Sequence, residues 1–202
     1  MLTASAIILV GGKSSRMGRA KALLPFDDEP ILVHSVRTLR EIVTDVVVVA
    51  APQQEVPPLP ATVIRDDIPH QGPVGGLFYG LRAVQHELCF VTACDAPFLH
   101  RRLVEHLFTL APHYDAVVPR WRAQLQPLHA VYHRSVLPLL RAQLDQGELR
   151  LLSLLSKVRI REVSNEELQR FDDVDMSFHN LNRPEDYAEA LARWQARRNS
   201  EC

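Results

Sequence analysis

The stretch that decides the fold is ASAIILVGGKSSRMGRAK, at residues 4–21. Residues 4–10 are mostly apolar, and residues 11–21 contain three glycines, two serines and four Lys or Arg residues. A buried strand that runs into a glycine-rich turn presents backbone N–H groups that can surround phosphate oxygens, and the cations add charge. The stretch therefore predicts a phosphate-binding loop directly after the first strand.

Counting residues excludes two common phosphate-binding loops. A Walker A loop read through the Gly-Lys-Ser at 12–14 requires glycine where the chain has Ile7. A dinucleotide-binding fingerprint that began at Gly11 would require glycine in place of Lys13 and Arg16. The loop is neither of these.

β-rich runs alternate with helical patterns through the first part of the chain. Strands are expected at residues 5–10, 45–50, 62–65, 88–92 and 116–119. Apolar residues three and four apart predict helices at residues 30–42, 74–85 and 100–110. The alternation predicts an α/β fold, a single Rossmann-like domain with a mostly parallel sheet flanked by helices. Such sheets bind ligands at the C-terminal ends of their strands.

The second half of the chain has a different pattern. Residues 122–132 are expected to be extended, in a hairpin or as one strand, and residues 158–163 to form another strand. Helices are predicted at residues 135–146, 151–157 and 184–197, with a frayed tail from residue 197. We expect one domain over 1–202, divided into a nucleotide-binding part (1–120), an acceptor-binding part (121–186) and a terminal helix with its tail (187–202).

Composition limits the partners and the location. The formal net charge of -1 gives no broad electrostatic surface for nucleic acid or an anionic membrane. The apolar run at 4–10 is too short to span a bilayer and has no basic leader, so a cytoplasmic protein is predicted. Cys89 and Cys94 fall in one strand region, where extended chain would hold them about 17 Å apart. We expect both to be reduced.

Asp95 is the best candidate for a metal ligand. It follows the apolar run CFVTAC at residues 89–94, so it lies at the sheet edge where the first loop is also expected. One Mg²⁺ ion that bridges this carboxylate and a triphosphate would complete a nucleotide site. The alternative is an N-cap or turn aspartate ahead of Pro97.

Four motifs together resemble a known family. The loop fits Leu-x-Gly-Gly-x-Ser-x-Arg-Met-Gly followed by lysine, the pattern of nucleotidyltransferases that activate sugars and cofactors, and Asp-x-Pro follows at 95–97. QPLHAVY at 126–132 and FHNLNRPED at 178–186 are similar to segments of molybdenum cofactor guanylyltransferases. The resemblance runs through nearly the whole chain. It implies transfer of GMP from GTP to the phosphate of molybdopterin, with Mg²⁺ and with release of pyrophosphate. Molybdenum-insertion proteins and molybdoenzyme chaperones are further candidate partners.

The resemblance and the reaction type together give roles to residues. Arg16 suits the pyrophosphate because its fork grips two oxygens, Lys21 suits the α-phosphate as a compact charge, and Asp95 holds the metal. The expected nucleotide-binding residues are Leu9, Val10, Gly11, Gly12, Ser14, Arg16, Lys21, Asp66, Gly75 and Asp95. The expected acceptor-binding residues are Gln126, Asn180 and Asn182. Asp67 is an alternative to Asp66, and capping of the terminal helix is the alternative role for Asn180 and Asn182.

Other assignments remain open at this stage. Guanine-specific relatives often carry an asparagine after the second strand, where this chain has Ala50-Ala51. A related enzyme, which transfers CMP to molybdopterin or activates a sugar phosphate, is therefore an alternative, as is a protein that binds nucleotide without catalysis. Trp121 is either a ring-stacking residue or the exposed tip of a hairpin. His129 is expected to be an ordinary core or surface histidine on a strand.

Overall fold

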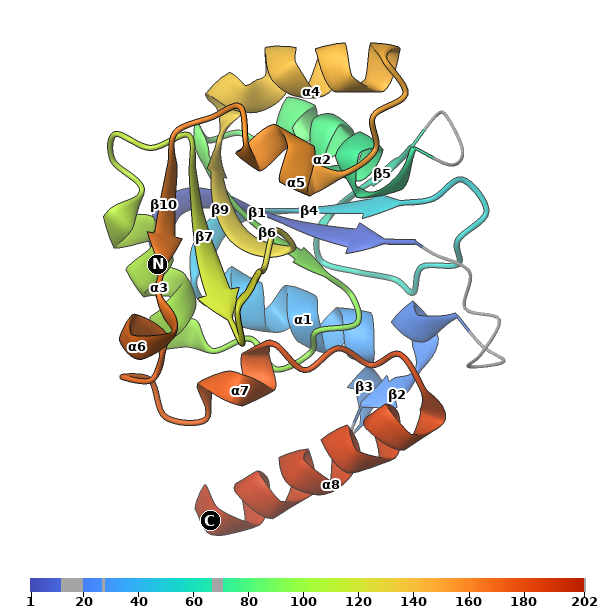
Figure 1. Cartoon of the computed structure of the whole chain (residues 1–202). Helices are drawn as coiled ribbons and strands as arrows, with labels where there is room; N and C mark the ends of the chain where they lie inside the picture. The colour runs from blue at the N-terminus through green and yellow to red at the C-terminus, as the bar shows by residue number, and fades with distance from the viewer. Residues whose placement is uncertain (12–19, 27, 67–70, 202) are drawn as a thin grey trace.

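The computed structural model describes the backbone of residues 1–11, 20–26, 28–66 and 71–201, and the side chains of these segments up to residue 196. The described residues form a sheet with helices on both faces, and the C-terminal helix crosses below it (Figure 1). This arrangement confirms the predicted α/β fold.

The main sheet is mostly parallel. Its strands are β1 (Leu2–Val10), β4 (Val43–Ala50), β5 (Thr62–Arg65), β6 (Leu88–Ala93), β7 (Ala116–Trp121), β8 (Gln124–Leu125), β9 (His129–His133) and β10 (Ile160–Val163). Their order in the described residues is β10-β7-β9-β6-β1-β4-β5, with β8 paired to β7. β9 is antiparallel to both β6 and β7, so β7 runs in the same direction as β6. The C-terminal ends of β1, β4, β5, β6 and β7 therefore lie along one edge, which is where ligands bind such sheets.

Helices cover the two faces of the sheet. They are α1 (Ile31–Arg40), α2 (Gly72–Ala83), α3 (Arg101–Leu110), α4 (Leu137–Asp145), α5 (Leu151–Leu155), α6 (Asn165–Leu168), α7 (Val174–Ser177) and α8 (Pro184–Glu201). Single 3₁₀ turns, η1 (Lys21–Leu23) and η2 (Arg134–Val136), precede β2 and α4. α1 and α3 pack on one face, and α2, α4 and α5 pack on the other (Figure 1).

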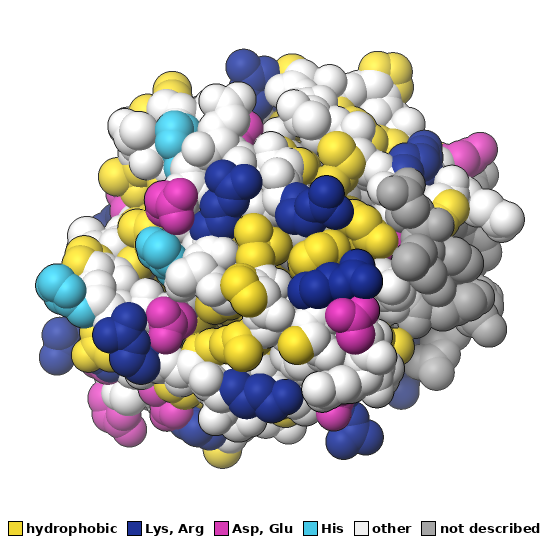
Figure 2. All heavy atoms as spheres, turned by 90° about the horizontal axis from the view of Figure 1, so that it is seen from above, with side chains coloured by type: hydrophobic (Ala, Val, Ile, Leu, Met, Phe, Trp, Pro, Cys, Tyr) yellow, Lys and Arg dark blue, Asp and Glu magenta, His cyan; other side chains and the backbone are white. Residues whose placement is uncertain are grey.

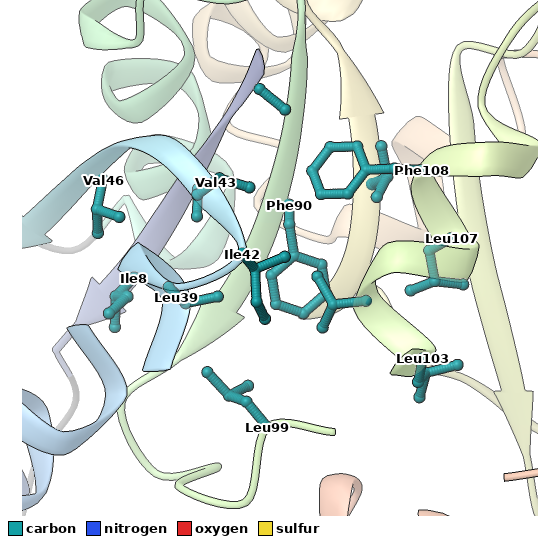
Figure 3. Packing of buried hydrophobic residues seen from close by; sticks show 14 of the residues in the cluster. Ile8, Leu39, Ile42, Val43, Val46, Phe90, Leu99, Leu103, Leu107 and Phe108 are labelled. Carbon is teal, nitrogen blue, oxygen red and sulfur yellow. The ribbon is translucent and has the colours of Figure 1, made fainter. Parts of the chain in front are cut away.

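The core forms because successive residues of the central strands point to opposite faces. Ile8 packs in the cluster that contains Leu39 of α1 and Leu103 of α3 (Figure 3). Its neighbour Ile7 packs in the second cluster, with Leu77 of α2. Both faces of β1 are covered, which explains why its sequence is an apolar run rather than an alternation of apolar and polar residues.

Glycines allow α2 to lie directly on β1. A Cβ atom added at Gly80 would stand 2.7 Å from Cδ1 of Ile7, and one added at Gly76 would stand 3.0 Å from Cδ2 of Leu9. Larger residues would push the helix away from the strand. The close contact holds the N-terminus of α2 at the ligand-binding edge.

Several predictions about the elements need correction. The predicted helix at 135–146 is divided into η2 and α4, and the short strands β2 (Pro25–Phe26) and β3 (Glu29–Pro30) were not expected. The terminal helix does not end at residue 197 but continues through α8 to Glu201. The last residues, ARRNSE at 196–201, contain no glycine or proline that would end a helix.

The cysteines, the charged side chains and the helices can each be compared with the expectations from composition. Cys89 and Cys94 are buried free thiols, as predicted. Figure 2 shows Lys and Arg side chains interspersed with acidic and apolar ones on the face that it draws, rather than one continuous basic area. In the described part of the chain, none of the helices has both the length and the apolar character to cross a bilayer.

Candidate active site

The ends of β1, β4 and β6 are tied together at the sheet edge. The N–H of Ala51 donates to the carbonyl of Val10 at 2.9 Å, and the N–H of Cys94 donates to the carbonyl of Leu9 at 3.1 Å. These bonds fix Gly11 between the two neighbouring strand ends. The chain then leaves the described region at residue 12 and returns at residue 20, just before η1.

Three distant segments meet at Lys21. Its Nζ donates to Oδ2 of Asp95 at 3.0 Å and to Oδ1 of Asn182 at 3.1 Å. A backbone bond of 2.8 Å from the N–H of Leu181 to the carbonyl of Asp95 holds the third segment in place. The Lys21 and Asp95 side chains are 19% and 21% exposed, so both remain accessible to a ligand. We call these three residues the Lys21–Asp95–Asn182 cluster.

The capping role considered for Asn182 is filled by another residue. The carboxylate of Asp186 accepts hydrogen bonds from the N–H groups of Asn182 and Arg183, at 2.9 and 2.8 Å, and so satisfies the start of α8. The backbone bond from Asn182 is the main reason why the pKa of Asp186 is lowered. The side-chain oxygen of Asn182 is therefore available to Lys21.

Cys94 is not the reactive group of this site. Burial raises the pKa of its thiol to about 12, and the neighbouring Asp95 carboxylate acts in the same direction. The thiol therefore stays protonated near neutral pH, whereas only a thiolate acts as a nucleophile or a metal ligand. At the end of β6, Asp95 and not Cys94 is therefore the candidate to contact a ligand or a metal ion.

Asp66 lies at the N-terminus of α2. Its N–H donates to the carbonyl of Ala50 at 3.0 Å, which places it just past the end of β5. A Cβ atom added at Gly75 would stand 3.3 Å from Oδ2 of Asp66 and 2.4 Å from Cβ of Gln71. The absence of a side chain at Gly75 therefore allows the close fit of this aspartate against the helix. Asp67, the alternative, lies outside the described residues.

The expected acceptor-binding residues separate into two groups. Gln126 and Asn180 both line a pocket of about 440 Å³, whereas Asn182 belongs to the lysine cluster. Trp121 lines the same pocket and stacks on Phe178, with ring centroids 5.3 Å apart and an interplanar angle of 22°. The predicted hairpin is present as β7 and β8, but Trp121 is partly buried and is not an exposed tip.

Part of the predicted site lies outside the described residues. This applies to Gly12, Ser14 and Arg16. Sequence reasoning also missed the pairing of Lys21 with Asn182, because these residues are 161 positions apart. His129 is a buried strand residue, as expected, and burial lowers its pKa to about 3.

Comparison with known families identifies the family of the chain. The sequence model of the MobA-like NTP transferase domain matches residues 6–162. The chain belongs to this family. As a MobA-like NTP transferase it is a nucleotidyltransferase, which confirms the enzyme class that the sequence motifs predicted.

Relatives of this MobA-like NTP transferase match along nearly their whole length. It is 32% identical over 190 residues to a probable molybdenum cofactor guanylyltransferase of Pelotomaculum thermopropionicum, covering 94% of this chain and 93% of the relative. It is 32% identical over 196 residues to the molybdenum cofactor guanylyltransferase of Desulfosudis oleivorans, covering 96% and 97%. The structure of molybdopterin-guanine dinucleotide biosynthesis protein A from Archaeoglobus fulgidus matches with a TM-score of 0.79 and 25% identity, covering 95% and 99%.

Proposed function

We propose that the protein transfers GMP from GTP to the terminal phosphate of molybdopterin. An oxygen of the acceptor phosphate attacks the α-phosphorus of GTP, the bond to the β-phosphate oxygen breaks, and pyrophosphate leaves. The product is molybdopterin guanine dinucleotide. The observation that carries the proposal is the Lys21–Asp95–Asn182 cluster at the sheet edge, together with relatives that are named for this reaction.

The cluster suits a reaction in which negative charge builds up on phosphate oxygens. A fixed cation at the transferred group stabilises that charge without reorganisation, and Lys21 is held in position by two side-chain oxygens. We assign Lys21 to the α-phosphate and Arg16 to the departing pyrophosphate, where a planar fork can bind two oxygens. Asp66 and Gly75 are assigned to the nucleotide side of the site.

The donor set fits Mg²⁺ that is shared with the nucleotide. In the described part of the chain, no group of three His, Cys, Asp or Glu side chains is placed to hold a metal ion. Mg²⁺ does not need such a group, because it commonly binds one or two carboxylates, with phosphates and water completing its shell. Asp95 would hold the ion, which would neutralise phosphate charge when bound.

A different nucleotide is the second candidate, and Ala50-Ala51 favours it. Two methyl groups at the end of β4 offer no amide to read a guanine edge. The Lys21–Asp95–Asn182 cluster would serve CMP transfer equally well, because the roles assigned to it concern the phosphates and the metal ion and not the base. The proposal also divides the chain into a nucleotide part (1–120) and an acceptor part (121–186). Since GTP and molybdopterin are intracellular metabolites, we place the reaction in the cytoplasm.

The experiment is pyrophosphate release by the purified protein with Mg²⁺, molybdenum-loaded molybdopterin and each of the four ribonucleoside triphosphates in turn. Release with GTP, together with a dinucleotide product identified by mass, is the expected result. Release with CTP alone would change the assigned base and keep the mechanism. No release with any triphosphate, when GTP still binds, would refute the transferase activity and favour a nucleotide-binding protein. Omission of the acceptor controls for simple triphosphate hydrolysis.

A further inference from the structure

The pocket at the end of β7 lies beside the Lys21–Asp95–Asn182 cluster. Asn180 lines the pocket, and Asn182, two residues further along, binds Lys21. We propose that this pocket binds the flat, uncharged heterocycle of the acceptor, its pterin ring, stacked on Trp121. The inference rests on the proposed function and extends it by assigning one part of the acceptor, its ring, to one side chain, Trp121.

Two aromatic residues that line the pocket, Trp121 and Phe178, end a column of aromatic rings that begins in the core. Phe90 and His129 have centroids 5.1 Å apart, His129 and Phe178 are 5.0 Å apart, and Phe178 stacks on Trp121. Phe90 and His129 are buried, so the column is anchored at its lower end. Phe178 braces one face of the indole, so little conformational freedom is lost when a flat ligand ring stacks on the other face and the exposed Arg122 guanidinium over the indole moves aside.

The rim of the pocket carries groups that both donate and accept hydrogen bonds. Gln124, Gln126 and Asn180 line it, and each side-chain amide offers N–H donors and a carbonyl acceptor. His179 lines it as well, and its Nε2 is shielded from solvent with no hydrogen-bond partner among the described residues. A pterin presents an amino group and a lactam on one edge. The rim therefore suits a ring with alternating donors and acceptors better than an apolar one.

The charges that line the pocket balance one another. Arg193 lies 2.7 Å from Glu189 and 3.5 Å from Asp175, so one guanidinium neutralises much of the charge of both carboxylates. Arg122 has no carboxylate partner in the described residues, and its guanidinium carbon lies 5.8 Å from the centroid of the Trp121 ring. With two cations and two anions in its lining, the pocket favours an uncharged ring over a phosphate group.

The turn between β7 and β8 fixes this arrangement. Arg122 and Ala123 have φ values of 47° and 67°, in the region that two-residue hairpin turns normally fill with Asn-Gly. Nη1 of Arg120 donates to the carbonyl of Ala123 at 3.0 Å and supports the turn. Holding two residues that have side chains in this conformation costs free energy. Strained backbone positions of this kind cluster at active sites and ligand sites.

The place of the pocket in the sheet separates it from the nucleotide. The strand order puts β7 on one side of β6 and puts β4 and β5 on the other, beyond β1. Asp95, at the end of β6, lies between the two sides. The Cα atoms of Asn180 and Asn182 are at most about 7 Å apart. A ring in the pocket and a phosphate at Lys21 are therefore close enough to belong to one small substrate molecule. The guanine base belongs on the opposite side, near Asp66.

The test uses 6-hydroxymethylpterin as the probe, titrated calorimetrically into the whole protein. Trp121→Ala is expected to weaken pterin binding at least about fivefold, because one stacked ring contributes that much or more. Trp121→Phe retains a stacking face and is expected to restore most of the affinity. Tyr114→Ala is the matched control, since it removes a 37% exposed aromatic side chain just before β7, at the end opposite Trp121. Binding of GTP with Mg²⁺ and the melting temperature are measured for every variant.

Several results would overturn the assignment. These are no pterin binding by the unaltered protein, equal affinities in Trp121→Ala and Tyr114→Ala, and a parallel loss of GTP affinity in Trp121→Ala, which would place the nucleotide base in this pocket. Pterin binding that depends on Trp121 in a protein that releases no pyrophosphate would support the pocket and refute the proposed function. The two failures are therefore distinguishable.

Discussion

Replacement of Lys21 by methionine tests whether the lysine acts on the reaction or only braces the fold. Methionine keeps the unbranched shape and removes the charge. The structure predicts a small effect on stability, because the Lys21 and Asp95 side chains are 19% and 21% exposed and water can replace the lost partner. Pairs of this kind contribute about 1 kcal/mol or less, which corresponds to a decrease in Tm of about 2–4 °C in a chain of this size.

The effect on turnover should be much larger. Removal of one preorganised group that stabilises developing charge costs about 100- to 1,000-fold in kcat, or about 2.7–4 kcal/mol. We therefore expect Lys21→Met to lose at least about 100-fold in the rate of pyrophosphate release, measured with saturating GTP, Mg²⁺ and acceptor. Lys157→Met is the matched control, because Lys157 is exposed and far along the chain in a different segment. It should change neither quantity.

Two outcomes would refute this reasoning. Retention of kcat within about twofold would show that Lys21 makes no contact specific to the transition state. A loss of activity that is fully explained by unfolding at the assay temperature would show that Lys21 only stabilises the fold, by connecting Asp95 and Asn182. A circular dichroism melt of the same samples decides between these readings.

Three further predictions concern neighbouring groups. Asp95→Asn should raise the Mg²⁺ concentration for half-maximal activity at least about tenfold with an unchanged melt, and an unaltered Mg²⁺ response would remove Asp95 from the metal site. Gly75→Ala would place a Cβ atom 2.4 Å from Cβ of Gln71, so stability should fall by about 1–3 kcal/mol and GTP binding should weaken, while a second change, Gln71→Gly, should recover most of the loss. His129 has its pKa lowered from 6.5 to about 3 by burial. Between these two pH values His129 is protonated in the unfolded chain and neutral in the folded chain. The free energy of unfolding should therefore decrease as the pH falls from about 6.5 towards 3. The slope should be shallower in His129→Phe, as measured by urea unfolding across that range, and equal slopes would contradict the assignment.

The fold was predictable because its signals are local. Residues 5–10 and 45–50 are apolar runs of strand length, and the structure pairs them as β1 and β4. Gly75 and Asp66 are both expected among the nucleotide-binding residues, and the structure brings them together. The antiparallel insertion of β9 was not specified, because a residue pattern gives the period of a strand but not its direction.

The site was less predictable because its contacts are long-range. Asn182 had two competing roles, and the sequence could not decide between them. Only the structure shows that Asp186 caps the helix and leaves the Asn182 side chain for Lys21. The sequence leaves ring stacking and a hairpin tip both open for Trp121, because its stacking partner, Phe178, lies in another motif. Two aromatic residues in separate motifs predict a stacked pair only when both motifs are expected at the same edge of the sheet.

The C-terminal segment completes a site that the family match does not fully contain. The match ends at residue 162, whereas Asn182 supplies one of the two oxygens that hold Lys21. Its position depends on Leu181, which is buried, bonds to the carbonyl of Asp95 and packs in the small cluster with Phe26 and Ala190 of α8. Packing of α8 is therefore coupled to the placement of the Asn182 side chain in the Lys21–Asp95–Asn182 cluster. The same segment carries Phe178 and Asn180 into the neighbouring pocket, so one stretch of chain connects the Lys21–Asp95–Asn182 cluster to the pocket that we propose for the acceptor ring.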